Sequence, residues 1–172
     1  DARASLINGA RSMGRAVAGA PRAATAYAPG ELIPVPATSH MSIVDDEGNA
    51  VAMTTSVQTT LGSGVMVRGF MLNNELTDFS FRPERGGRPI ANAPAPGKRP
   101  LSSMAPTLVF DPSDRLEMVT GSPGGAWIIG YVAQSVIAVL DWGLTAPEAA
   151  SLPHALDRNG PRLNSIIELN PD

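Results

Sequence analysis

From His40 onward, apolar and polar residues alternate in short runs separated by turn residues, which predicts β-strands. MSIVD is followed by the turn residues DEGN and then by AVAMTTSVQ, so we expect a β-hairpin with Gly48-Asn49 in its turn. Both faces of this hairpin are largely apolar, which predicts a sheet covered on both sides. Three further strand patterns follow, the last two forming a second hairpin around the turn PSDR: VMVRGFMLNN (65–74), PTLVFD (106–111) and LEMVTGS (116–122).

Helical patterns lie at both ends of the chain. The apolar run AWIIGYVAQSVIAVL (126–140) is too short to span a membrane, so we expect a buried core helix. TAPEAASL (145–152) is typical of a short helix capped by Thr145, with a glutamate three residues later. Residues 1–20 have loosely helical spacing, whereas 20–37 carry four prolines and no period, which predicts an exposed connector. This order predicts an α+β layered domain with an antiparallel sheet.

The amino-acid composition argues against some partners and some chemistry. The net charge of −3 and the scattered arginines argue against a nucleic-acid partner, because phosphate binding needs a basic stripe. With no cysteine there are no disulfides and no thiol chemistry, and the compartment stays open. The 172 residues suffice for one ordinary domain. The chain begins at Asp1 without an initiator methionine, so we expect a piece of a larger protein.

Metal and serine-triad chemistry are poorly supported. The two histidines, His40 and His154, lie far apart in sequence without a second ligand at metal-binding spacing. The nucleophile-elbow pattern Gly-x-Ser-x-Gly is absent. We therefore expect no metal site.

Other short stretches allow two interpretations each. GSPGG (121–125) joins a strand to a helix, where backbone N–H groups can hold an anion or simply form a tight turn. Ser102 and Ser103 could converge on a carboxylate if the backbone is irregular there, or form a polar strand edge. Glu75 and Asp78, three residues apart, could bind an ammonium group together or be ordinary surface acids.

Taken in order, five stretches resemble the gamma-glutamyltranspeptidase (glutathione hydrolase) family. They are TSHMSIVDDEGNAV (38–51), TSVQTTLGSG (55–64), MLNNELTDFS (71–80), GKRPLSSMAPT (97–107) and VTGSPGGAWII (119–129). The resemblance implies the N-terminal-nucleophile hydrolase fold, an αββα sandwich with mostly antiparallel sheets, incomplete in this chain. It implies no metal or organic cofactor, and a periplasmic or extracellular location.

The resemblance also implies that the precursor cuts itself between Ala37 and Thr38. The Thr38 hydroxyl would attack the preceding carbonyl, and hydrolysis of the resulting ester would free an α-amine that serves as the base. Residues 1–37 would then be the C-terminal tail of a large subunit, and 38–172 a C-terminally truncated small subunit. The remainder of the large subunit would be its partner.

Site roles follow from the same resemblance. Thr38 would take the gamma-glutamyl group of glutathione or a related small molecule, and Ser56 would hydrogen-bond this nucleophile. The other residues would bind separate charges: the oxyanion would be bound by Gly124 and Gly125, the substrate α-carboxylate by Ser102, Ser103 and Gln58, and its α-ammonium group by Glu75 and Asp78.

Three departures from the family pattern matter. Gln58 stands where an Asn is usual, so its amide reaches further. Ala126-Trp127 replaces polar residues after the paired glycines. The stretch 78–102 is short and lacks Tyr, so a more open site should favour hydrolysis over transfer. Two alternatives remain: a glutaryl-type (cephalosporin) acylase on the same fold, and a non-cleaving degenerate homologue that acts as a binding protein.

Overall fold

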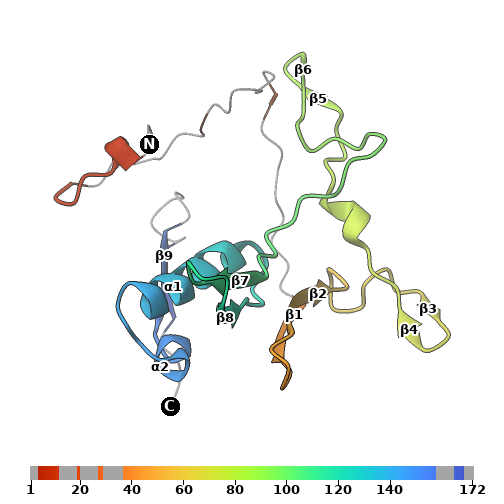
Figure 1. The fold of residues 1–172 in the computed structure, drawn as a ribbon. Helices are drawn as coiled ribbons and strands as arrows, with labels where there is room; N and C mark the ends of the chain where they lie inside the picture. Colours follow the sequence, from red (N-terminus) through yellow and green to blue (C-terminus); the bar gives the residue numbers. More distant parts are fainter. Residues whose placement is uncertain (1–3, 12–18, 20–26, 29–36, 158–164, 169–172) are drawn as a thin grey trace.

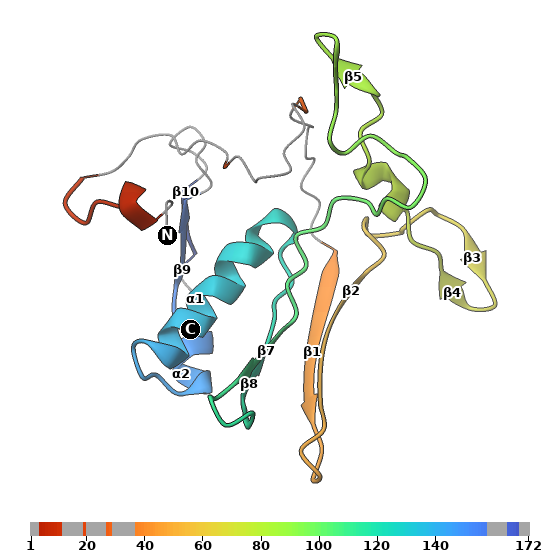
Figure 2. The same ribbon diagram turned by 45° about the horizontal axis from the view of Figure 1, so that its top comes forward.

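Two β-hairpins and one helix lie side by side at the centre of the molecule (Figure 1). The structure is a computed structural model that describes residues 4–11, 19, 27–28, 37–157 and 165–168. Strand β1 (Thr38–Val44) pairs with β2 (Ala50–Ser56), and β7 (Thr107–Phe110) pairs with β8 (Leu116–Thr120), both antiparallel. Helix α1 (Ile128–Leu140) lies on one side of β7–β8 and the β1–β2 hairpin on the other (Figure 2).

Shorter elements surround this centre. They are η1 (Ala4–Leu6), β3 (Met66–Val67), β4 (Phe70–Met71), η2 (Glu75–Asp78), β5 (Glu84–Arg85), β6 (Arg88–Pro89), η3 (Gly125–Trp127), α2 (Ala146–Ala150), β9 (His154–Asp157) and β10 (Ser165–Glu168). Every strand pair in the described part of the chain is antiparallel, and one isolated parallel bridge joins Ala28 to Ile90. The predicted α+β class with antiparallel pairing is confirmed.

An aspartate closes each of the two central hairpins. The Asp45 carboxylate accepts from the amides of Glu47 (3.0 Å) and Asn49 (2.7 Å) in the β1–β2 turn. The Asp111 carboxylate accepts from the amides of Ser113 (2.8 Å) and Arg115 (3.0 Å) in the β7–β8 turn. Such side-chain bonds stabilise tight turns, so both hairpins close locally, as the sequence predicted.

Helix ends follow the predicted chemistry. Thr145 caps α2, its backbone N–H donating to Glu148 Oε2 (2.8 Å) while its own hydroxyl accepts from the Glu148 amide (3.5 Å). Helix α1 contributes Ile128, Tyr131, Val132 and Ala138 to the buried apolar residues. Within the described part of the chain, no helix has the length and apolar character needed to cross a membrane.

Two strand predictions are wrong in detail. Residues 65–74 form the small β3–β4 hairpin and not one strand, because Arg68 (φ 50°) and Gly69 (φ 85°) adopt left-handed conformations that reverse the chain. The β9–β10 pair was not predicted at all. The helix expected over 1–20 falls largely outside the described residues, where only the single turn η1 is seen, and so does most of the connector 20–37.

The β1–β2 hairpin lacks the expected cover. Its large apolar side chains are 39–53% exposed, namely Met41, Ile43, Val44, Val51 and Met53. Among the described residues, no layer covers both faces of this hairpin, so that prediction is wrong. The reason is that the neighbouring β7–β8 hairpin contacts it along one side and the only long described helix lies beyond that neighbour.

Candidate active site

The bond between Ala37 and Thr38 lies at the first rung of the β1–β2 ladder. Thr38 begins β1 and is paired with Ser56, the last residue of β2. The Ser56 hydroxyl donates to the Ala37 carbonyl oxygen (2.8 Å) and accepts from the Gln58 amide (2.8 Å). Ser56 is therefore held against the carbonyl of the peptide bond that the family resemblance implies is cleaved.

His40 joins this strand to the glycine-rich loop that follows β8. Its Nδ1 is 2.8 Å from Thr54 Oγ1 and its Nε2 is 3.0 Å from Ser42 Oγ. A side chain at Gly121 would overlap the His40 ring, so only glycine allows this close approach. The contact places the start of GSPGG beside the strand that Thr38 begins.

The same loop turns sharply into the helices. Gly124 (φ 129°) and Gly125 (φ 55°) lie in a conformation that favours glycine, and Gly125 begins η3. A Cβ at Gly124 would be 2.9 Å from Tyr131 Cε2 in α1, so the loop also packs closely on the helix. This is the predicted strand-to-helix turn, with both glycines at its helical end.

Glu75 and Asp78 lie on the single turn of η2 and are half-buried. Burial raises the pKa of Glu75, and the neighbouring charge and hydrogen bond of Asp78 raise it further. Burial also raises the pKa of Asp78, against the lowering effect of its hydrogen bond with Glu75. The Gln58 side-chain amide donates to Asp78 Oδ1. Two crowded carboxyl groups of this kind favour a bound proton or cation.

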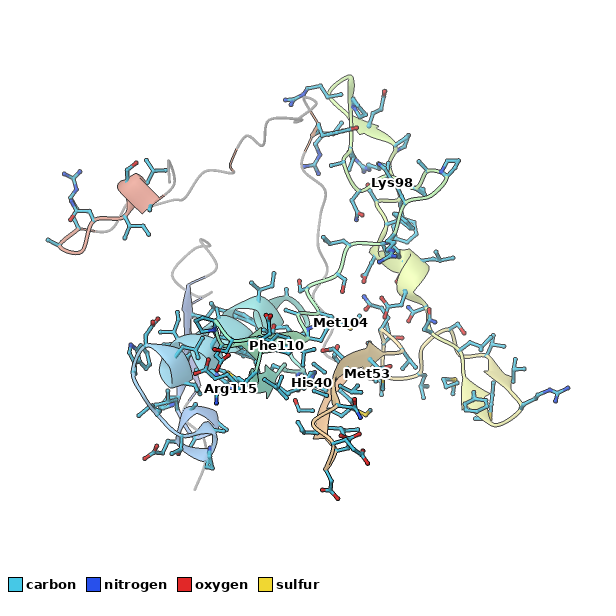
Figure 3. All side chains as sticks on the ribbon, viewed as in Figure 1. His40, Met53, Lys98, Met104, Phe110 and Arg115 are labelled. Atoms are coloured by element: carbon cyan, nitrogen blue, oxygen red, sulfur yellow. The ribbon has the colours of Figure 1, made fainter. Side chains whose placement is uncertain are left out.

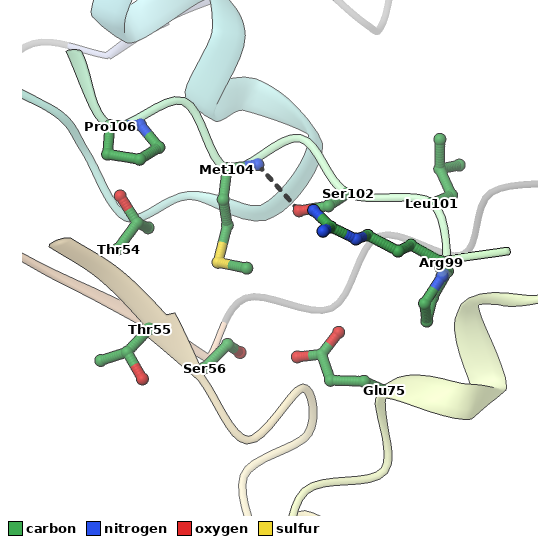
Figure 4. Close-up of a pocket in the computed structure, with 10 residues that line it drawn as sticks. Thr54, Thr55, Ser56, Glu75, Arg99, Leu101, Ser102, Met104 and Pro106 are labelled. Carbon is green, nitrogen blue, oxygen red and sulfur yellow. Dashed lines mark hydrogen bonds between the residues drawn. The ribbon is translucent and has the colours of Figure 1, made fainter. Parts of the chain in front are cut away.

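A pocket of ≈ 510 Å³ opens between β2, η2 and the irregular segment before β7 (Figure 4). Its lining residues are Thr54, Thr55, Ser56, Glu75, Arg99, Pro100, Leu101, Ser102, Met104 and Pro106. Three predicted site residues from separate parts of the chain, Ser56, Glu75 and Ser102, thus meet at one pocket.

The remaining predicted residues lie outside this lining. Asp78 contacts the lining residue Glu75, and Gln58 is hydrogen-bonded to both Asp78 and the lining residue Ser56. Ser103 follows Ser102 in a stretch without regular secondary structure. The irregular backbone at the serine pair is the condition under which both hydroxyls can converge. Thr38, Gly124 and Gly125 are not among the lining residues.

Arg99 was not predicted as a site residue, although it lines the pocket on the side facing Glu75 (Figure 4). Its position three residues before Ser102 was the available signal, because a cation beside paired hydroxyls suits a carboxylate. Within the described ranges, no group of three or more His, Cys, Asp or Glu side chains is placed to hold a metal ion.

Comparisons with known proteins agree with one another. The family model named Gamma-glutamyltranspeptidase matches residues 1–171. The glutathione hydrolase proenzyme of Escherichia coli (strain K12) is 45% identical over 136 residues, which cover 73% of this chain and 23% of that protein. The chain thus spans about a quarter of that curated relative's length.

Two solved structures have the same fold. An acivicin-inhibited gamma-glutamyltranspeptidase, described as revealing critical roles for its C-terminus in autoprocessing and catalysis, matches with a TM-score of 0.60 and 39% identity. That match covers 69% of this chain and 66% of the solved one. The Helicobacter pylori gamma-glutamyltranspeptidase matches with a TM-score of 0.60 and 39% identity, covering 69% and 67%. These neighbours confirm the predicted N-terminal-nucleophile hydrolase type.

Proposed function

The chain belongs to the gamma-glutamyltranspeptidase family, and from this we propose that it acts in a self-processing gamma-glutamyl hydrolase with Thr38 as nucleophile. The observation that carries the proposal is the 2.8 Å hydrogen bond from Ser56 to the Ala37 carbonyl, at the first rung of β1. The fraction of each relative's length that this chain matches also supports the proposal. The chain covers 23% of the E. coli proenzyme but 66% of a solved chain, a difference expected if family precursors are divided.

Processing begins with attack of the Thr38 hydroxyl on the Ala37 carbonyl carbon. The Ser56 O–H, already donating to that carbonyl oxygen, stabilises the negative charge that develops there. The C–N bond then breaks, the amine takes the proton, and an ester links Ala37 to the Thr38 oxygen. Water hydrolyses this ester and leaves a free carboxylate on Ala37 and a free α-amine on Thr38.

Turnover reuses the same hydroxyl. The α-amine accepts the Thr38 hydroxyl proton as the oxygen attacks the gamma-glutamyl amide, and the backbone N–H groups of Gly124 and Gly125 bind the oxyanion. The amine leaving group departs with a proton, and water cleaves the acyl ester to release glutamate. Hydrolysis is favoured over transfer because 78–102 offers no tyrosine to cover the site.

Charge placement supports a glutamyl donor. Burial raises the pKa of both Glu75 and Asp78, and the Asp78 charge raises that of Glu75 further, so both carboxyl groups favour a positive partner such as a substrate α-ammonium group. Ser102, Ser103 and the amide of Gln58 would hold the α-carboxylate, with Arg99 adding positive charge beside Ser102. A glutaryl group has no ammonium and would leave the two carboxyl groups unpaired.

The test uses the full-length precursor. Thr38→Ala should abolish both the cleaved form, followed by intact mass and N-terminal sequencing, and turnover of a gamma-glutamyl anilide. Ser39→Ala, the exposed neighbouring hydroxyl, is the matched control and should behave as wild type. Cleavage or turnover retained in Thr38→Ala would refute the proposal, and faster turnover of a glutaryl anilide by the wild-type enzyme would identify an acylase.

A further inference from the structure

A short stretch upstream of β1 contacts the β5–β6 region. Ala28 forms a parallel bridge with Ile90: the Ala28 amide donates to the Pro89 carbonyl (2.9 Å), and the Ala91 amide donates to the Ala28 carbonyl (3.4 Å). Ala28 and Ile90 are only 4% and 3% exposed, which places them among the most buried of the described residues. This contact is therefore a small core of its own.

Two cationic side chains contact Tyr27, the residue before Ala28. Arg88 Nη2 donates to the Tyr27 carbonyl (2.9 Å), and the Lys98 ammonium lies 5.9 Å from the centre of the Tyr27 ring. Lys98 also donates to the carbonyls of Ala91 (3.0 Å) and Ala93 (3.2 Å), which fixes it in this part of the molecule (Figure 3). We call Arg88, Ile90, Ala91 and Lys98 the tail clamp.

The clamp holds a residue of the chain that lies shortly before the bond cleaved in the proposed function. From Ala28 to Ala37 the chain can reach at most about 30 Å, since an extended residue spans about 3.3–3.6 Å. Three prolines in this stretch, Pro29, Pro34 and Pro36, restrict it further. The clamp fixes one end of the stretch, and Ser56 and the β1 ladder fix the other.

We propose that the tail clamp positions the segment upstream of Ala37–Thr38 for self-cleavage, an inference that rests on the proposed function. Holding both ends of a short segment limits the backbone conformations between them, so the Ala37–Thr38 peptide adopts the orientation in which the Thr38 hydroxyl faces the Ala37 carbonyl carbon more of the time. The clamp acts on processing and not on later turnover. Its residues are positioning residues.

The test places one charge on either side of the contact in the full-length precursor. Ala28→Asp and Ile90→Asp each bury an unpaired carboxylate, and each should slow the appearance of the fragment that begins at Thr38 by about tenfold or more. The double variant should be no slower than the slower single variant, because both break one contact. Ala10→Asp and Phe81→Asp are the matched controls, both at exposed positions, and should process at the wild-type rate.

A second readout separates positioning from misfolding. Once fully processed, Ala28→Asp should turn over a gamma-glutamyl anilide at the wild-type rate, because Ala28 lies outside the pocket lining. Processing of Ala28→Asp at the wild-type rate would overturn the clamp and leave the proposed function intact. A wild-type precursor that stays uncut would overturn both.

A crosslink tests the contact without processing. Neighbouring strands lie about 4.8 Å apart, within the range of about 4.4–6.8 Å between Cα atoms that a disulfide bridges. Ala28→Cys with Ile90→Cys should therefore form a disulfide in the uncleaved Thr38→Ala precursor, seen as a mass change reversed by reductant. Failure to form it under oxidising conditions would overturn the clamp.

Discussion

The carboxylates that close the hairpin turns and those beside the pocket have opposite surroundings. Hydrogen bonds, led by the Asn49 side chain, lower the pKa of Asp45, and bonds from the Arg115 amide and side chain lower that of Asp111. Burial and mutual repulsion raise the pKa of Glu75, and burial raises that of Asp78. Hydrogen bonds within the fold stabilise the charged form of the first pair, whereas burial disfavours the charged form of the second pair even though Gln58 donates to Asp78.

From this difference we infer that the first pair stabilises the fold and that the second pair serves to bind a ligand. A carboxylate already surrounded by donors gains little from a substrate. Crowded carboxylates lower stability in the free protein, and an ammonium group removes that cost when it binds. Buried carboxyl groups with raised pKa values are therefore candidate ligand-binding residues.

The largest expected effect comes from neutralising the pocket pair. Glu75→Gln or Asp78→Asn should raise KM for a gamma-glutamyl anilide by about 10- to 100-fold, as loss of a charge-assisted hydrogen bond implies. Stability should be unchanged or higher, because the repulsion is gone. Steady-state kinetics and urea unfolding measure the two effects. A loss of stability with unchanged KM would show that the pair is structural.

The turn pair should respond in the opposite way. Asp111→Ala removes the acceptor of the Ser113 and Arg115 amides and should lower Tm by about 2–4 °C. Asp111→Asn keeps an acceptor oxygen and should lose less. Both variants should keep wild-type KM in the processed enzyme, and a raised KM would contradict the division between the two pairs.

Acid titration should show opposite signs for the two pairs. A lowered pKa in the folded state means that Asp45 and Asp111 contribute stability above their ordinary value of 3.8 that is lost as pH falls below it. A raised pKa means that Glu75 lowers stability at neutral pH and that this cost is relieved as pH falls towards its ordinary value of 4.5. Tm should be measured as a function of pH. Glu75→Gln should remove the rise in Tm that the wild type shows as pH falls from neutral towards 4.5. Asp111→Asn should reduce the drop in Tm that the wild type shows below pH 3.8. Parallel curves of Tm against pH for the wild type and both variants would refute the predicted opposite contributions of the two pairs to stability.

The smallest expected effect concerns Gln58, which contacts the pocket pair through Asp78. Gln58 has φ 76°, a conformation that Asn tolerates better, and its side chain donates to Asp78. Gln58→Asn should raise unfolding free energy by a few tenths of a kcal/mol while changing KM by about two- to fivefold. Gln58→Gly, which relaxes the backbone but removes the amide, is the control. A KM of Gln58→Gly equal to that of the wild type would show that the amide has no role.

Most helices and strands could be predicted from short-range sequence signals, whereas the others depend on long-range packing. Turn and cap residues such as Gly48 and Thr145 act on near neighbours, so both central hairpins and α2 were predictable. Arg68 gives no sign in sequence of its left-handed conformation, so the β3–β4 hairpin was missed.

The candidate site was predictable only through the family resemblance. Ser56, Glu75 and Ser102 are far apart in sequence, and no periodic pattern joins them at one pocket. The bridge from Ala28 to Ile90 has no sequence signal either, because it joins two residues that are far apart in sequence. Arg99 was missed since its neighbours Ser102 and Ser103 already explained carboxylate binding.

The pairing of Thr38 with Ser56 has a consequence for the chain end that cleavage would create. New termini usually fray, but this one would remain the first rung of a ladder whose next six residues, Ser39 to Val44, are all paired. The hydroxyl and the amine would then be preorganised on one immobile residue. The conformational entropy of aligning nucleophile and base would be lost once, when the hairpin folds, and not again in each catalytic cycle.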